Sequence, residues 1–423
     1  MKPQMVKYGK EELMECIDVF NVSKETQAKI RELLEQEDPE PNAGVFFRYY
    51  NERSKVVEFE KQFAEKMGVP YVLAVNSGTS ALIAAMVAAG VGPGDEVIVP
   101  AYTFFASVSA IVVAKALPII VDIDETLTIS PEAIEKAITP RTKAIVCVHM
   151  IGLPCNMAKI TEIAKKHNLK VIEDTAQACG GKFQGKRLGT WGDFGCISLD
   201  AYKVIGSGEG GVVMCKNEFE YTRAQSWHDT AACWRPKRYA RERQEGELFC
   251  GENYRMSELE GAVALAQLRK LDWIVETCRK NWNRIRESVK LPAGVKWVET
   301  NDNSGVCGYS LPMMFEDQEY AVRVQTAKFG VGGNALNETQ GVRNWHMAWY
   351  WEHILEQKAA TQDGCPFTCP HNKDIKLNYT VDSWPETKRI IGHMGTIAGI
   401  TPFLTEEQIK EKIDRINNGF KTV

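Results

Sequence analysis

The chain has 423 residues, a formal net charge of −4 and 44% hydrophobic residues. This length suits one large domain with a smaller second one, and the mild acidity provides no basic surface for nucleic acid or an anionic membrane. The first residues are charged and no apolar run reaches membrane-spanning length, which argues against a secretory signal and against a membrane protein.

Twelve cysteines are scattered along the sequence. Cys147, Cys196 and Cys215 lie in apolar, strand-like runs, where a free thiol packs as a small hydrophobic group. We therefore expect a reducing cytoplasm. The one clustered pair, Cys365 and Cys369, has no second pair at zinc spacing, so no metal site is predicted.

Residues 1–45 mix helical patterns with acidic turn signals and predict an N-terminal arm. An amphipathic helix follows, because its apolar residues fall on one face. These residues are Val56, Phe59, Phe63 and Met67.

Seven short apolar runs then predict strands, most of them separated by helical patterns. They are residues 71–75, 96–100, 118–122, 143–149, 170–174, 196–199 and 211–215. Several are apolar along their whole length, which favours an α/β fold with a mostly parallel seven-stranded sheet covered on both faces. In such sheets ligands bind beyond the carboxyl ends of the strands.

The remaining sequence predicts a long helix over 257–289 that links two domains, then a smaller α+β unit with a strand over 309–315 and a closing helix over 405–413. We therefore divide the chain into an arm (1–45), a large cofactor-binding domain (46–289) and a small domain (290–423). The tract 344–353, rich in aromatic residues and histidine, is consistent either with a substrate pocket or with packing.

Two residues near the ends of predicted strands indicate chemistry. Asp174 ends the run 170–174, and Lys203 follows the run 196–199 just before the glycine-rich turn 206–211. Each has a plainer interpretation, since an aspartate at a strand end often caps a helix and a lysine beside glycines is usually solvated. Together and in this order they favour a pyridoxal phosphate site, in which lysine forms a Schiff base with the cofactor aldehyde and an acid keeps the pyridine nitrogen protonated.

Two further segments lie at strand ends. Small residues over 76–80 join a strand to an alanine-rich helix, where free backbone N–H groups and the helix dipole favour a phosphate; the same residues are also ordinary N-cap chemistry. Phe104, beyond the strand 96–100, could stack on a flat ring or pack in the core.

With these motifs in place, residues 56–271 resemble the DegT/DnrJ/EryC1/StrS sugar aminotransferase family of fold-type-I pyridoxal phosphate enzymes. The matching motifs occur in family order. They are residues 76–79, 93–97, 103–104, 173–177, Gly189, 192–193, Ser198, Lys203, 208–211, Asn253 and 255–256.

The resemblance implies roles for eight residues, with Lys203 and Asp174 as the catalytic pair. Lys203 carries the aldimine and Asp174 pairs with the pyridine nitrogen. Gly78, Thr79 and Ser198 bind the cofactor phosphate.

The other three residues surround the cofactor. By the resemblance Phe104 stacks on the ring and Gln177 lies near its hydroxyl group. Asn253 reaches the phosphate of the neighbouring subunit, which implies a homodimer with shared active sites.

The sequence departs from the family pattern in two places. Leu199 stands where Phe is common, which is conservative for packing, and residues 394–400 lack the usual proline. The stretch 122–143 looks most like members that aminate an eight-carbon keto-sugar acid, although aminocyclitol and nucleotide-sugar members share much of it.

The expected function is a pyridoxal phosphate-dependent aminotransferase in amino-sugar biosynthesis. It would move an amino group from an amino-acid donor, such as glutamate, to a keto- or aldehydo-sugar or a related polyol. The alternatives are a sugar dehydratase of the same fold, disfavoured because such members have histidine in place of Lys203, and a non-catalytic sugar-sensing regulator. A dinucleotide-binding protein is disfavoured because the glycine run 206–211 precedes a strand.

Overall fold

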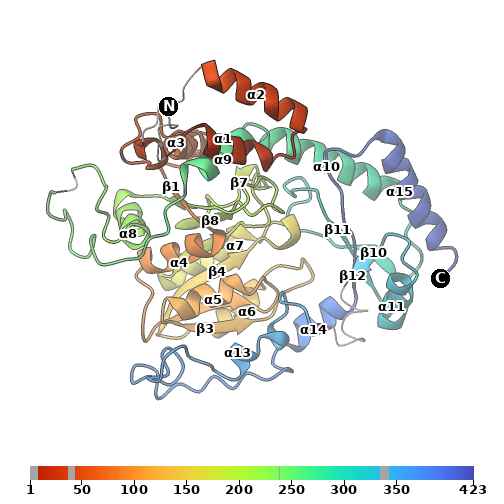
Figure 1. Cartoon of the computed structure of the whole chain (residues 1–423). Coiled ribbons are helices and arrows are strands. Elements are labelled where there is room, and N and C mark those ends of the chain that lie inside the picture. The colour runs from red at the N-terminus through yellow and green to blue at the C-terminus, as the bar shows by residue number, and fades with distance from the viewer. Residues whose placement is uncertain (1–7, 37–42, 238, 334–342) are drawn as a thin grey trace.

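The computed structural model describes residues 8–36, 43–237, 239–333 and 343–423. Figure 1 shows a central sheet flanked by helices, with a second, smaller sheet toward the C-terminal end. The helices are α1 (Lys10–Asp18), α2 (Lys24–Gln36), α3 (Lys55–Met67), α4 (Gly78–Ala88), α5 (Ala106–Val113), α6 (Pro131–Ala137), α7 (Met157–His167), α8 (Glu218–His228), α9 (Glu258–Leu268), α10 (Leu271–Ser288), α11 (Gln318–Thr326), α13 (Glu352–Leu355), α14 (Pro385–Gly392) and α15 (Glu406–Gly419).

The central sheet has seven strands, and only one of them runs against the others. Its order is β1 (Tyr71–Val75), β9 (Gly211–Cys215), β8 (Phe194–Ser198), β5 (Lys170–Asp174), β4 (Thr142–Val148), β2 (Glu96–Pro100) and β3 (Leu117–Val121). The antiparallel strand is β9. The predicted α/β fold with a mostly parallel seven-stranded sheet is confirmed. Four strands have the predicted bounds, and β3, β4 and β8 are shifted by one or two residues.

Alternating strand residues send their side chains into two apolar layers. On β2, Val97 and Val99 join the core under α4 and α5, whereas Ile98 joins the core under α6 and α7. The face of β1 and β9 that carries Val72 and Val212 packs against α3 and α9. Because helices cover both faces of the sheet, a ligand reaches it at the ends of the strands.

A second sheet is built by the C-terminal part of the chain. Its order is β10 (Val295–Trp297), β11 (Leu311–Phe315), β13 (Met394–Ile397) and β12 (Gly332–Gly333). A short hairpin of β6 (Lys182–Phe183) and β7 (Lys186–Arg187) completes the strands of the described residues. The division into parts 1–45, 46–289 and 290–423 stays a prediction.

The C-terminal region also closes the β3 edge of the central sheet. The Tyr379 hydroxyl accepts a hydrogen bond from Ile120 N at 2.9 Å and donates one to Pro118 O at 3.0 Å. The indole of Trp384 donates to Ile120 O at 3.0 Å. These bonds satisfy backbone groups that an edge strand otherwise leaves open.

The single helix predicted over 257–289 is two helices. Ser257 caps the start of α9 in a capping box with Glu260, as the sequence indicates. The helical hydrogen-bond pattern is interrupted at Lys270, whose N–H bonds to Gln267 O. The break lets α9 pack against α3 while α10 continues toward the small sheet, where Trp282 donates to Ser310 O. Neither glycine nor proline marks this break in the sequence.

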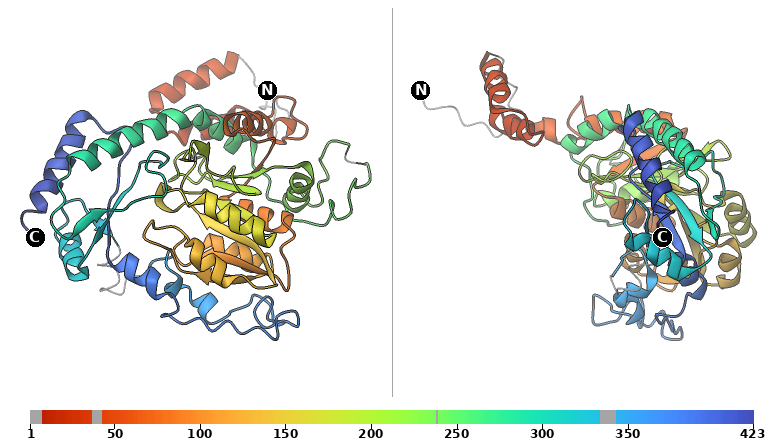
Figure 2. Two further views of the ribbon diagram at one scale, coloured as in Figure 1. Left: turned by 180° about the vertical axis from the view of Figure 1, so that it is seen from behind. Right: turned by 90° about the vertical axis from the view of Figure 1, so that its right-hand side faces the viewer.

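The N-terminal region extends from the body of the molecule. Figure 2 shows α1 and α2 projecting away from the sheet, and α2 has no buried residue. Of the predicted arm over 1–45, residues 1–7 and 37–42 lie outside the described residues. Among the described residues no helix is both long enough and apolar enough to cross a membrane.

Candidate active site

The carboxyl ends of β5 and β8 bring two predicted site residues to one edge of the sheet. The strands are parallel neighbours in which Asp174 is paired with Cys196, so Ser198 lies two residues further along the same edge. Asp174 and Ser198 are both buried. The parallel pairing therefore explains why residues 24 apart in the sequence meet.

The Asp174 carboxylate is held by two hydrogen bonds. Its Oδ2 accepts from the Ser107 hydroxyl at 2.6 Å, and its Oδ1 accepts from Ala176 N at 3.1 Å. Because Ser107 gives its only hydroxyl hydrogen to Asp174, Thr103 must donate to Ser107 across their 2.7 Å contact. No described cation pairs with this carboxylate, so its charge is oriented but uncompensated.

Lys203 lies in a tight loop that returns beside the end of β8. Leu199 N bonds to Gly210 O at 2.9 Å, Ser207 N bonds to Leu199 O at 2.8 Å, and Lys203 N bonds to Asp200 O at 3.0 Å. A Cβ at Gly206 would lie 2.6 Å from Asp200 O, so the close return requires glycine there. The Lys203 side chain is partly buried, and its amine makes no hydrogen bond with the described residues.

Gly78 and Thr79 begin α4 beside Ser198. The Ser77 hydroxyl caps the helix by accepting from Ser80 N at 3.0 Å, whereas the first amides of a helix have no intrahelical partner. A Cβ on Gly78 would lie 2.6 Å from Ser198 Cβ. The helix start thus packs directly on the β8 end, and its amides and dipole suit an anion.

Phe104 and Gln177 lie on the segments that follow β2 and β5. The Phe104 ring is 47% exposed and contacts the His346 ring at a centroid distance of 5.4 Å. The Gln177 side chain is fixed because its Oε1 accepts from Ile151 N at 3.0 Å, and the Tyr309 hydroxyl donates to Gln177 O at 2.8 Å. Burial raises the pKa of Tyr309 far above its usual value, which keeps this donor protonated.

A cavity of about 630 Å³ contains Lys203 and Gln177, a volume within the range of ligand sites. The C-terminal part of the chain contributes His346 and residues 399–403 to its wall, and Lys270, at the α9–α10 break, contributes a second amine. The sequence left the role of 344–353 open and gave no sign that Lys270 lies here.

Asn253 does not face this cavity. It is exposed on a loop that is anchored by a bridge to Asp229 and by the bond from Asn76 N to Tyr254 O at 2.8 Å. The contact of Asn253 with the phosphate of another subunit stays a prediction.

Glu173, the first residue of the motif 173–177, has a structural role. Its carboxylate is fully buried and accepts from the backbone N–H groups of Gly189, Trp191 and Gly192 at 2.7–2.8 Å, and from His149 Nε2 at 3.1 Å. Four donors satisfy the charge and fix the loop that leads into β8. Glu173 therefore supports the strand that carries Ser198.

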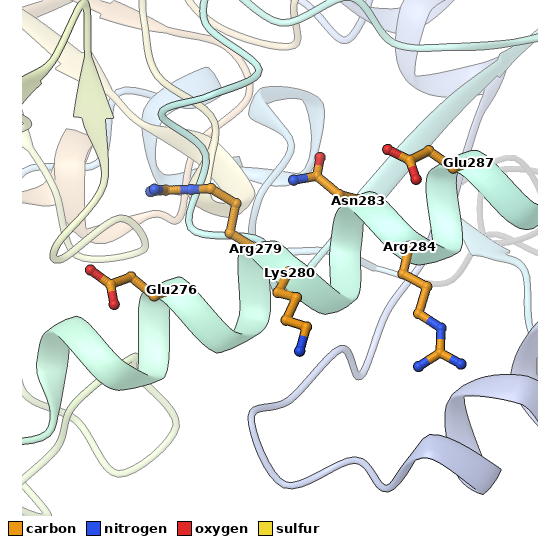
Figure 3. Close-up of a pocket in the computed structure, with 6 residues that line it drawn as sticks. All are labelled: Glu276, Arg279, Lys280, Asn283, Arg284 and Glu287. Carbon is orange, nitrogen blue, oxygen red and sulfur yellow. The ribbon is translucent and has the colours of Figure 1, made fainter.

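Not every hollow has this chemistry. The one shown in Figure 3, about 510 Å³, follows a single charged face of α10. Its labelled residues are Glu276, Arg279, Lys280, Asn283, Arg284 and Glu287. Over the described residues, no three His, Cys, Asp or Glu side chains gather in a way that could hold a metal ion.

The residues of the sheet edge fit pyridoxal phosphate. A helix start with no room for a side chain suits the phosphate. A carboxylate and a lysine amine that have no ion-pair partner in the described part of the chain suit a protonated pyridine nitrogen and the aldehyde, respectively. The assignments of Gly78, Thr79, Phe104, Gln177 and Ser198 to particular cofactor atoms stay predictions.

Comparison with known proteins gives the same indication. Residues 48–334 match the model of the DegT/DnrJ/EryC1/StrS aminotransferase family. A GDP-perosamine synthase of Caulobacter vibrioides is 41% identical over 223 residues, covering 51% of this chain and 57% of the relative. An L-glutamine:2-deoxy-scyllo-inosose aminotransferase of Streptomyces kanamyceticus is 39% identical over 219 residues, covering 51% of each. The chain thus spans little more than half the length of these curated relatives.

A solved structure is similar over nearly the whole chain. The structure of NtdA from Bacillus subtilis with its cofactor PMP bound is 25% identical with a TM-score of 0.66, covering 95% of this chain and 82% of that one. The fold is therefore that of the fold-type-I pyridoxal phosphate enzymes. From its motifs, its fold and the match over residues 48–334, the chain belongs to the DegT/DnrJ/EryC1/StrS aminotransferase family.

Proposed function

We propose that this protein is a pyridoxal phosphate-dependent aminotransferase that moves an amino group from an amino-acid donor to the carbonyl of a sugar-like acceptor. The observation that supports it most strongly is the Lys203 amine in a ligand-sized cavity, together with the oriented Asp174 carboxylate, neither of which has an ion-pair partner among the described residues. Family membership and the PMP-bound structural relative support the same activity.

When bound, the cofactor supplies an aldehyde that takes up an amine and a ring that accepts electrons. The Lys203 Nζ would hold the cofactor, be released when the donor amine takes its place, and then move a proton from the donor α-carbon. The Asp174 carboxylate would keep a proton on the ring nitrogen. The α4 amides would hold the phosphate and thereby fix the position of the ring.

For the acceptor we propose a keto-sugar that carries an acid group, such as an eight-carbon keto-sugar acid. The charged residues that line the cavity are Lys203 and Lys270, and no described Asp or Glu joins them. Such a lining attracts an anion. Lys270 is exposed and has no ion pair among the described residues, so its amine is available for the acid group.

For the donor we propose glutamate, and glutamine is the natural competitor because it appears in the name of one relative. Both present an α-amine and an α-carboxylate. Comparing the two donors at one acceptor concentration decides between them.

We further propose a homodimer in which Asn253 reaches the phosphate in the neighbouring subunit. The exposed position of Asn253 supports this arrangement. A reducing compartment such as the cytoplasm is supported by the twelve cysteines, all of which are free thiols.

The test is product analysis with the purified protein, pyridoxal phosphate, glutamate and a panel of keto-sugars. We expect amino sugar and 2-oxoglutarate in equal amounts, none with Lys203→Ala, and normal amounts with the control Lys280→Met on the outer face of α10. A sugar that loses water without gaining nitrogen would favour the dehydratase, and turnover by Lys203→Ala would contradict the proposed mechanism.

A further inference from the structure

The chain segment around His346 lies directly against the loop that carries Phe104. His346 O accepts from Thr103 N at 3.0 Å, and Ala348 N donates to Ala101 O at 3.0 Å. Tyr102 and Met347 form an antiparallel bridge between them. These contacts fix the backbone that carries the His346 side chain.

The hydrogen positions on this ring follow from its neighbour Asn344. Asn344 Oδ1 accepts from His346 N at 3.0 Å, which identifies that atom as the oxygen, and it also lies 3.0 Å from His346 Nδ1. An amide oxygen only accepts, so Nδ1 carries a hydrogen. Burial and the nearby Lys203 charge both lower the pKa of His346, so the ring is neutral and Nε2 carries a lone pair.

Nε2 has no hydrogen-bond partner among the described residues, although the ring is partly buried. His346 lines the cavity of about 630 Å³ that holds Lys203, and also a separate hollow of about 240 Å³ near the small sheet. Only the larger has the volume of a typical ligand site. A ligand in that cavity therefore contacts His346, whose unoccupied acceptor is Nε2, in the same lining as Lys203.

We propose that His346 Nε2 accepts a hydrogen bond from a hydroxyl group of the acceptor and so selects hydroxylated ketones over ketones without hydroxyl groups. The inference rests on the proposed function and deepens it. A lone pair requires a donor from the ligand, and a sugar hydroxyl supplies one where a bare carbonyl or carboxylate oxygen does not. A site that binds a substrate hydroxyl rejects the analogue that lacks it, because its own polar group is then left unpaired.

The test compares three variants. His346→Phe keeps an aromatic ring against Phe104 but removes both nitrogens, and His346→Gln keeps an acceptor and a donor. His353→Phe is the matched control, because His353 lies in the same tract, is exposed and does not line the cavity.

Each protein is first converted to its aminated form with donor and freed of excess donor. The return of the original absorbance is then followed with scyllo-inosose, a polyhydroxylated cyclohexanone, and with cyclohexanone. For His346→Phe we expect kcat/KM to fall about tenfold with the inosose and to stay within twofold with cyclohexanone, with partial rescue in His346→Gln. His353→Phe should match the wild type.

The proposal is overturned if the kcat/KM of His346→Phe falls by the same factor with both ketones, or if the wild type does not prefer the inosose. It is also overturned if the aminated wild type reacts with neither ketone. Failure of the proposed function gives a different result, since a wild-type protein whose absorbance does not respond to any donor fails before an acceptor is added.

Discussion

The central sheet and the C-terminal third contribute to one cavity in different ways. The sheet places Asp174 and Ser198 through parallel register and places Gly78 at a helix start. The C-terminal third places His346 through irregular backbone that is bonded to the loop after β2. This contrast indicates that the residues predicted to hold the cofactor phosphate and ring nitrogen lie at the ends of regular elements, whereas Lys203 and His346 lie on connections.

Replacing Asp174 by Asn tests a residue that the central sheet places, and it should have the largest effect. The amide keeps the size and the contact with Ser107 but cannot hold a proton on the ring nitrogen by charge. We expect turnover to fall about a thousandfold, measured as kcat for amino-sugar formation. Near-normal turnover with full cofactor occupancy would show that the carboxylate is structural.

Gly78→Ala tests the predicted phosphate site. The new Cβ would lie 2.6 Å from Ser198 Cβ, so the start of α4 must move away from the end of β8. We expect the dissociation constant for pyridoxal phosphate to rise by about tenfold or more, measured by titration of the absorbance. Gly92→Ala is the matched control, because nothing lies within 4 Å of its added Cβ; an equal loss in both variants would contradict the assignment.

Trp384→Phe tests whether the C-terminal third stabilises the sheet as well as closing the cavity. The fully buried indole donates to Ile120 O, and phenylalanine leaves that carbonyl without its partner. We expect a loss of about 1–2 kcal/mol in the free energy of unfolding. Trp273→Phe, at a 48% exposed site, should change it by less than about 0.5 kcal/mol. If the two variants had equal free energies of unfolding, the Trp384 hydrogen bond would not stabilise the central sheet.

Lys270→Met should have the smallest effect, because an exposed amine contributes weakly. We expect kcat/KM to fall about two- to fivefold for a keto-sugar acid and not at all for a neutral ketose. Lys280→Met serves as the control, because Lys280 is exposed on α10, lines the hollow of Figure 3 and does not line the cavity of Lys203. A loss that is the same for acid and neutral acceptors would remove the support for an anionic acceptor.

The two regions also differ in how far the sequence predicts them. Asp174 and Lys203 are predictable because buried strands are short apolar runs, and an aspartate at the end of one strand together with a lysine between the next strand and a glycine-rich turn is more informative than either residue alone. His346 was ambiguous, since its position depends on backbone bonds to residues 101–103, more than 240 positions earlier. Lys270 was missed because the α9–α10 break has no glycine or proline, and β10, β12 and β13 were missed because they have only two to four residues.

The most direct test of the central claim is the visible absorbance of the purified protein with pyridoxal phosphate, before and after glutamate is added. If Lys203 holds the cofactor and the first half of the reaction occurs, the wild type shows a yellow absorbance band that disappears when glutamate is added. Lys203→Ala lacks this band, because the cofactor has no lysine to join. A wild-type protein that binds no cofactor under these conditions, or an identical band in Lys203→Ala, would contradict the account.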